Sequence, residues 1–171
     1  MSLVDLTSMA KPNKEIRGKI LTKLGGIELI NCFQCLKCTS GCTAFKLLEL
    51  APHEVVKLVK LGFVEGLITS EIIWTCATCL KCTERCPQKA SPYHVIMALR
   101  NLAVEQGAKI PEAYLKAVSQ ILETGLLQTT RKVTTKEMET FDRKRLRLPE
   151  IKYPTKTFKT VLLKVLEGAL A

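Results

Sequence analysis

The chain of 171 residues lacks several patterns that mark common classes of protein. It has no glycine-rich loop for dinucleotides or phosphates, and neither of its two histidines lies beside a cluster of carboxylates. No uncharged run approaches the roughly 20 residues of a membrane-spanning helix. Residues 1–10 lack the basic start and apolar run of a secretory signal. We therefore expect neither a nucleotide-dependent enzyme nor a membrane-spanning or secreted protein.

Cysteine is used in only two places. All eight cysteines lie within residues 32–42 and 76–86, each with the spacing C-x2-C-x2-C-x3-C, and a proline follows the second run. Seven of the eleven aligned positions are identical. This spacing is typical of [4Fe–4S] ligation, whereas disulfide scaffolds are mostly short and secreted. The sequence therefore predicts two [4Fe–4S] clusters in a reducing compartment, the cytoplasm.

Each run is expected to supply ligands to both clusters. In two-cluster ferredoxins the fourth cysteine of each run ligates the other cluster. The predicted ligands are Cys32, Cys35, Cys38 and Cys86 for the first cluster, and Cys76, Cys79, Cys82 and Cys42 for the second. Zinc is the alternative, but each run supplies a third cysteine at iron–sulfur spacing. Because such sites form only on folding, we expect the metal-free protein to be poorly folded.

Several residues beside the cysteines have two interpretations. Lys37 and Lys81 could raise a cluster potential or could be solvated loop lysines. Thr39 and Thr83 could donate to sulfur or could stabilise the turns. Thr43 stands where the second run has its proline, which leaves the conformation of that loop open, but not the ligation.

Apolar periodicity predicts helices, and alternating runs typical of strands are nearly absent. Asn13 is a predicted helix cap, and Pro52 and Pro92 suit first turns. His53 and His94 lie near helix starts, so we expect them at the surface and not as ligands. The predicted helices cover residues 14–24, 52–61, 92–106 and 111–124, and a last amphipathic helix follows Thr157 as its cap.

The fold class follows from the segment between the cysteine runs. About 33 helix-prone residues separate the runs, whereas a small bacterial ferredoxin is built on short strands. We therefore predict a mainly α protein with an α-helical dicluster ferredoxin domain. The expected organisation is a helical extension over 1–24, this domain over 25–125, and a basic arm with a C-terminal helix over 126–171. The last helix either docks on a partner or folds back.

Charge is distributed unevenly. The formal net charge is +10, which two clusters would lower to about +6. Residues 25–108 hold eight basic and seven acidic residues, and residues 109–171 hold thirteen and seven. A basic segment at 131–147 could bind nucleic acid. Since it also carries acidic residues and only Phe141 as an aromatic, we favour an arm that contacts an acidic partner surface.

Four stretches within about residues 31–107 resemble the C subunit of heterodisulfide reductase and its relatives. They are Cys-Phe-Gln-Cys-x2-Cys-Thr-x-Gly-Cys at 32–42, Pro-His-Glu-Val-Val-Lys-Leu-Val-Lys-Leu-Gly at 52–62, Ile-Trp-Thr-Cys-Ala-Thr-Cys-x2-Cys-x2-Arg-Cys-Pro at 73–87, and Leu-Arg-Asn-Leu-Ala at 99–103. The leucine–lysine pairs within both cysteine runs, and Thr43, differ from the methanogen pattern. A sulfur-oxidising or sulfate-reducing relative therefore stays open.

The resemblance implies an electron-transfer subunit of a hetero-oligomeric complex. In that family, the C subunit connects a flavin-bearing protein to a cysteine-rich one, which reduces the disulfide of coenzymes M and B. This chain has no double-cysteine motif, so we do not expect it to cleave the disulfide itself. The iron–sulfur subunit of an organic-acid flavin dehydrogenase is the alternative, because it shares the cysteine spacing.

Overall fold

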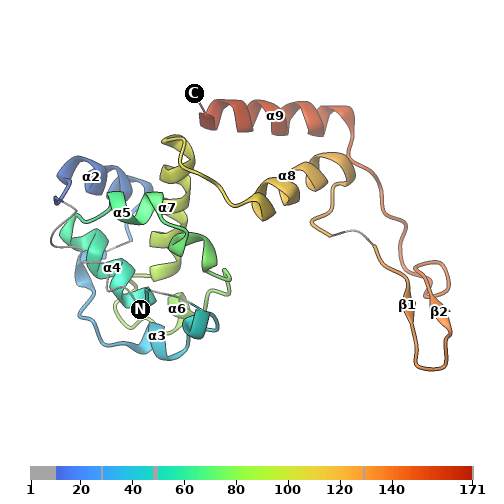
Figure 1. Cartoon of the computed structure of the whole chain (residues 1–171), viewed down its shortest axis with the longest axis horizontal. Helices are drawn as coiled ribbons and strands as arrows, with labels where there is room; N and C mark the ends of the chain where they lie inside the picture. Colours follow the sequence, from blue (N-terminus) through green and yellow to red (C-terminus); the bar gives the residue numbers. More distant parts are fainter. Residues whose placement is uncertain (1–10, 28, 48–49, 129, 171) are drawn as a thin grey trace. The chain divides into compact units, whose positions relative to one another are not determined.

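The computed structural model describes residues 11–27, 29–47, 50–128 and 130–170, and they form two compact units that divide after Lys109 (Figure 1). The described chain is mainly helical, as predicted. The first unit contains α2 (Lys14–Lys23), α3 (Lys37–Ser40), α4 (Pro52–Leu61), α5 (Glu65–Thr69), α6 (Lys81–Glu84) and α7 (Pro92–Glu105). Three short 3-10 turns, η1 (Leu29–Asn31), η2 (Phe45–Leu47) and η3 (Ile72–Thr75), connect them.

The three long helices of the first unit, α2, α4 and α7, begin where the sequence predicts and end within one residue of the predicted ends. The Asn13 side chain accepts a hydrogen bond from the Ile16 amide at 3.0 Å, which caps α2. Pro52 and Pro92 occupy the first turns of α4 and α7. α4 ends at Gly62, whose φ of 90° favours glycine because a side chain would strain this conformation.

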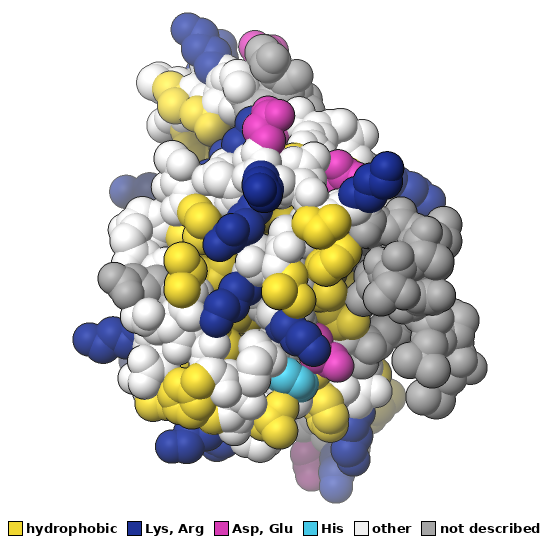
Figure 2. Space-filling view, turned by 90° about the vertical axis from the view of Figure 1, so that its left-hand side faces the viewer, with side chains coloured by type: hydrophobic (Ala, Val, Ile, Leu, Met, Phe, Trp, Pro, Cys, Tyr) yellow, Lys and Arg dark blue, Asp and Glu magenta, His cyan; other side chains and the backbone are white. Residues whose placement is uncertain are grey.

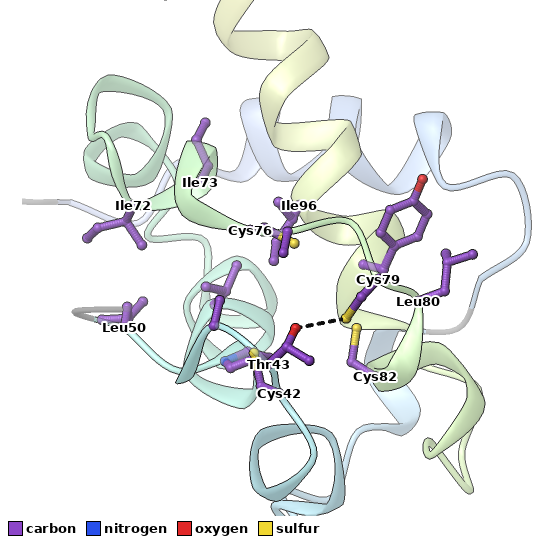
Figure 3. A pocket seen from close by; sticks show the side chains of 15 residues that line it. Cys42, Thr43, Leu50, Ile72, Ile73, Cys76, Cys79, Leu80, Cys82 and Ile96 are labelled. Atoms are coloured by element: carbon purple, nitrogen blue, oxygen red, sulfur yellow. Dashed lines mark hydrogen bonds between the residues drawn. The ribbon is translucent and has the colours of Figure 1, made fainter. Parts of the chain in front are cut away.

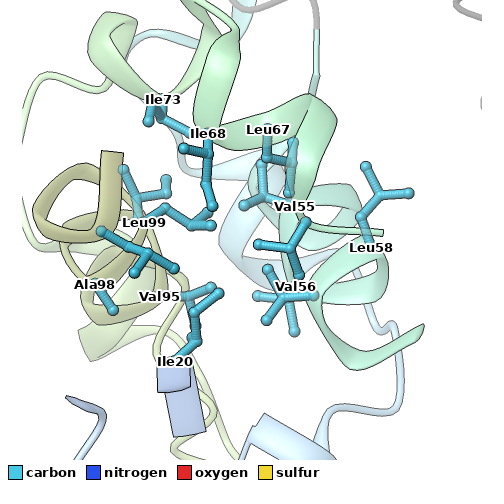
Figure 4. Packing of buried hydrophobic residues seen from close by; sticks show 14 of the residues in the cluster. Ile20, Val55, Val56, Leu58, Leu67, Ile68, Ile73, Val95, Ala98 and Leu99 are labelled. Carbon is cyan, nitrogen blue, oxygen red and sulfur yellow. The ribbon is translucent and has the colours of Figure 1, made fainter. Parts of the chain in front are cut away.

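A single hydrophobic core fixes the helices of the first unit. α7 lies at its centre and packs against α2, α4, α5 and α6. Ile20, Val56 and Leu99 are fully buried there, and Figure 4 shows them interleaved with neighbours from α4, α5 and η3. Removing such a side chain from water contributes about 1.5–3 kcal/mol. Cys32 and Cys76, the first cysteines of the two runs, pack against the edge of this core.

The second unit is smaller and contains α8 (Glu112–Thr124), β1 (Val133–Thr134), β2 (Thr140–Phe141) and α9 (Lys156–Leu170). The strands form an antiparallel pair, with Val133 opposite Phe141. This hairpin was not predicted, because a two-residue strand is too short to show alternation. Arg145 stabilises it: its guanidinium lies 4.3 Å from the centroid of the Phe141 ring and contacts Glu139 at 3.1 Å.

Two expectations differ from the structure. The cap of α9 is Thr155, whose hydroxyl accepts from the Phe158 amide at 3.2 Å, so the prediction of Thr157 was wrong. The compact units also differ from the three expected domains. α2 packs in the first unit through fully buried Ile20, whereas α8, none of whose side chains is buried, belongs to the second. Along the described residues, no helix is both long and apolar enough to cross a lipid bilayer.

Candidate metal centres

The fold gathers the eight cysteines into two sites. We name each site by the cysteine run that supplies three of its sulfurs. The first cysteine site is a cavity lined by Cys32, Cys35, Cys38 and Cys86. The second cysteine site is lined by Cys42, Cys76, Cys79 and Cys82, and Figure 3 shows it from close by.

The fourth cysteine of each run thus lies in the site of the other run. This exchange occurs because α3 and α6, the short helices within the two runs, pack against each other. A Cβ on Gly41 at the end of α3 would come within 2.6 Å of Arg85 side-chain carbons at the end of α6, so the glycine permits a close approach. Which cysteine binds which cluster stays a prediction, and this grouping agrees with the predicted ligand sets.

Both runs contain the same unusual backbone conformation. Gln34 and Leu36 in the first run have φ values of 61° and 66°, and Thr78 and Leu80 at the matching positions have 51° and 62°. Left-handed conformations cost non-glycine residues about 1–3 kcal/mol, and they persist where the surroundings over-determine them. Their repetition at matched positions indicates loops shaped around a common group.

The repetition extends into the helices that follow the runs. α4 and α7 each start with a proline and carry a basic residue eight positions later, Lys60 in α4 and Arg100 in α7. Lys60 Nζ donates to the carbonyl of Cys32 at 3.2 Å, and Arg100 Nη2 donates to the carbonyl of Cys76 at 2.9 Å. Each helix therefore holds the first cysteine of the preceding run.

Arg100 makes the more extensive of these two contacts. It is only 5% exposed, and its Nε also donates to the carbonyl of Ile73 at 2.8 Å. Nη2 reaches the carbonyl of Trp74 at 3.2 Å, while the guanidinium lies 5.4 Å from the centroid of the Trp74 ring. Three carbonyls before and within the second run thus depend on one buried side chain.

The residues fit two iron–sulfur clusters. Each site offers four cysteine sulfurs, which is the donor set of a [4Fe–4S] cluster. Apart from the cysteines, the second site is lined mainly by apolar side chains such as Leu50, Ile72 and Ile96. Among the residues described, no three cysteine, histidine or acidic side chains are placed to hold one metal ion together.

Comparison with known families agrees with this geometry. A family profile described as a 4Fe-4S dicluster domain matches residues 31–91, which include all eight cysteines. The match covers 61 of the 171 residues. The domain binds two [4Fe–4S] clusters, as the cysteine runs predicted.

Curated relatives carry the matching names. The chain is 31% identical over 117 residues to the C subunit of the ferredoxin:CoB-CoM heterodisulfide reductase of Methanosarcina acetivorans, covering 68% of this chain and 47% of that protein. It is 32% identical over 113 residues to the C subunit of the H(2):CoB-CoM heterodisulfide,ferredoxin reductase of Methanothermobacter thermautotrophicus, covering 66% and 60%. A protein of Archaeoglobus profundus, named as similar to the heterodisulfide reductase C subunit, is 34% identical over 91 residues, covering 53% and 48%.

These matches confirm the resemblance to the C subunit of heterodisulfide reductase. The chain spans about half to three-fifths of the length of these relatives. The dicluster domain makes the chain an iron–sulfur protein, and [4Fe–4S] clusters can take up and release single electrons.

Threonine and histidine side chains connect the dicluster loops to the helices. The Thr39 hydroxyl and His53 Nδ1 share a hydrogen bond at 2.7 Å. The hydroxyls of Thr83 and Ser91 are 2.8 Å apart, and Ser91 contacts His94 Nδ1. Both histidines are half-buried, so each lies partly at the surface while it bonds to a neighbouring hydroxyl. Both threonines tie their loop to the start of the following helix, and the Thr39 hydroxyl also lies 3.9 Å from Cys38 Sγ.

Other polar groups contact cysteine sulfurs directly. Gln34 Nε2 donates to Cys32 Sγ at 3.3 Å, and the Ala90 amide donates to Cys86 Sγ at 3.2 Å, both in the first site. Burial raises the pKa of the free Cys82 thiol to about 11. It also raises the pKa of the Cys38 thiol. These two thiols must lose their protons when they bind iron, so iron binding supplies the free energy that ionises them.

Sequence reasoning missed the roles of Lys60, Arg100 and Gln34. Lys60 and Arg100 lie in stretches that carry the family resemblance, but nothing in those stretches alone indicates carbonyl binding. A signal was nevertheless present. Aligning the two helices from their prolines pairs Val55 with Val95 and Lys60 with Arg100, which extends the repeat to the basic residues.

Removing the iron is expected to disrupt the cysteine loops. The metal-binding free energy is folding free energy when a site cannot form in the unfolded chain, and two strained loops depend on it here. We expect anaerobic chelation to lower the midpoint of thermal unfolding by more than about 10 °C, since 1 kcal/mol corresponds to roughly 2–4 °C at this chain length. Circular dichroism and limited proteolysis of residues 32–42 and 76–86 measure the change. An unchanged melting curve after complete iron removal would contradict this coupling.

Proposed function

We propose that the chain is the electron-transfer subunit of a heterodisulfide reductase-like complex. It would relay electrons between a cysteine-rich catalytic subunit that reduces a disulfide and a flavin-containing subunit. The proposed ligands are Cys32, Cys35, Cys38 and Cys86 for one cluster and Cys42, Cys76, Cys79 and Cys82 for the other. One observation carries the proposal: all eight cysteines are shared between two adjoining four-cysteine sites. The relatives of this domain are named as C subunits of heterodisulfide reductases.

The exposure of the two sites supports a relay with two ends. Cys35 in the first site and Cys79 at the matching position of the second are both exposed. Beside them, Leu36 is 50% exposed and Leu80 is 46% exposed. An exposed apolar side chain next to an accessible cysteine suits a partner that excludes water and brings its own redox group close. Each site thus offers its own route to the protein surface.

The charge around these routes suggests the chemistry of the partners. Lys37 follows Leu36, and Lys81 follows Leu80, so each exposed leucine has a basic neighbour. Figure 2 shows one face of the molecule on which apolar side chains lie among many lysine and arginine side chains and few acidic ones. A basic neighbour beside each exposed leucine suits partners with acidic rims, because opposite charges speed association and set orientation.

The second unit supplies a further docking element. The apolar stripe of α9 is largely exposed: Phe158, Val161 and Val165 are 42%, 56% and 62% exposed. Two arginines of the basic segment at 131–147 form hydrogen bonds within the second unit. Arg143 donates to the carbonyl of Pro149 at 2.7 Å, and Arg145 contacts the hairpin. These contacts favour a folded protein-docking unit over an open basic arm for nucleic acid.

Co-purification with matched surface variants tests the proposal. The chain is expressed with two proteins of a heterodisulfide reductase operon, a flavoprotein and a cysteine-rich protein, and complexes are isolated without oxygen. We expect a complex of all three, in which reduced flavoprotein reduces the clusters. Leu36→Glu and Leu80→Glu are expected to weaken binding to different partners, because each changes one site's surface. A chain that binds neither protein, but binds an organic-acid flavoprotein, would overturn the proposal in favour of that alternative.

A further inference from the structure

The two cysteine runs differ at the residue that follows the fourth cysteine. Thr43 stands in the first run where Pro87 stands in the second. The Thr43 hydroxyl donates a hydrogen bond to Cys79 Sγ at 3.3 Å, which Figure 3 shows as a dashed line. Pro87 lines the first site but has neither a hydroxyl nor an amide hydrogen, so it cannot make the same contact.

The hydrogen bond crosses between the runs. Thr43 belongs to the first run and Cys79 to the second, and both line the second site. The Thr43 hydroxyl acts on an iron-bound sulfur, because a bound thiolate keeps its negative charge.

A donor to a cysteine sulfur stabilises the reduced cluster more than the oxidised one. Reduction adds one electron, and the added negative charge spreads onto the sulfurs. The apolar neighbours Leu50, Ile72 and Ile96 strengthen this effect, because they lower the local dielectric constant on their side of the site. On the other side of the site, where Cys79 is exposed, water competes with the Thr43 hydroxyl as a hydrogen-bond donor to the sulfur.

From this geometry we propose that Thr43 is a positioning residue that raises the reduction potential of the cluster in the second cysteine site. The inference rests on the proposed ligand set of Cys42, Cys76, Cys79 and Cys82. It assigns a role to Thr43, which stands where the second run has a proline after its fourth cysteine. Gln34 and the Ala90 amide donate to sulfurs of the first site, so Thr43 supplies the second site with a donor of its own.

Redox titration followed by electron paramagnetic resonance tests the inference. Thr43→Val keeps the shape of the side chain and removes the donor, whereas Thr43→Ser keeps the donor. Ser40→Ala is the matched control, because the Ser40 hydroxyl bonds the carbonyl of Lys37 and no sulfur. We expect Thr43→Val to lower the potential of one cluster and leave the other unchanged, at full iron content. Thr43→Ser and Ser40→Ala should leave both potentials as in the unmodified protein.

The outcomes separate this inference from the proposed function. Equal potentials in Thr43→Val and the unmodified protein, with both clusters present, would overturn the role of Thr43 and leave the relay intact. A shift of both clusters by similar amounts would also overturn it, because the effect would not be confined to one site. If valine disturbs the loop and iron is lost, Thr43→Ala provides the same comparison. An unmodified protein with a single cluster would overturn the ligand sets and this inference together.

Discussion

Replacing Cys86 with alanine is expected to abolish the cluster that we propose is bound by Cys32, Cys35 and Cys38, although Cys86 belongs to the other run in sequence. The reason is its position, since Cys86 lines the first cysteine site. Loss of one of four ligands removes a [4Fe–4S] cluster or leaves it labile, so iron should fall from about eight to about four atoms per chain.

The pattern among four alanine variants distinguishes crossed from uncrossed ligation. Crossed ligation predicts that Cys86→Ala and Cys38→Ala leave the same residual paramagnetic signal. Cys42→Ala and Cys82→Ala should leave the other one. Each pair acts as the matched control of the other, since all four changes remove one sulfur. If Cys86→Ala gave the same signal as Cys82→Ala, each run would bind its own cluster and the ligand sets would be wrong.

The second large effect is expected at Arg100. Replacement by methionine would leave the carbonyls of Ile73, Trp74 and Cys76 without their donor. An unsatisfied buried polar group costs about 1–3 kcal/mol, so we expect a loss of roughly 3 kcal/mol or more in the free energy of unfolding. Because these carbonyls lead into the second run, the cluster of the second site should be lost first. Anaerobic chemical unfolding and iron analysis measure both effects.

Lys60 provides the matched control for Arg100. It occupies the equivalent position in α4 but is less buried, and Nζ donates to the carbonyls of Ile30 and Cys32 at 2.8 and 3.2 Å. Lys60→Met should therefore cost less and affect the first site. Arg100→Lys should fall between the unmodified protein and Arg100→Met, because a single ammonium group cannot reach all three carbonyls in the same geometry. Equal losses in Arg100→Met and Lys60→Met would contradict the importance of burial.

The metal chemistry could be predicted because its determinants are local in sequence. Cysteine spacing within eleven residues specifies the kind of cluster, and a proline or asparagine at a helix start specifies the start itself. α2, α4 and α7 therefore begin where they were expected. The repetition of one cysteine pattern also made the number of clusters predictable from the order of residues alone.

What could not be predicted depends on contacts between distant segments. Arg100 binds carbonyls that lie 24 to 27 residues earlier in the chain, and no local pattern marks such a partner. Thr43 was visible only as a missing proline, because its contact with Cys79 forms when α3 packs against α6. The hairpin of the second unit was missed for a similar reason. It is held by Arg145 and not by alternating residues of its strands.

Iron and sulfide analysis, combined with electron paramagnetic resonance of protein purified and reduced without oxygen, tests the central claim most directly. Two [4Fe–4S] clusters require about eight irons and about eight inorganic sulfides per chain. The reduced protein should show two clusters whose signals interact, since the two cysteine sites adjoin through α3 and α6. Zinc without iron, or a single isolated cluster, would contradict a two-cluster electron relay.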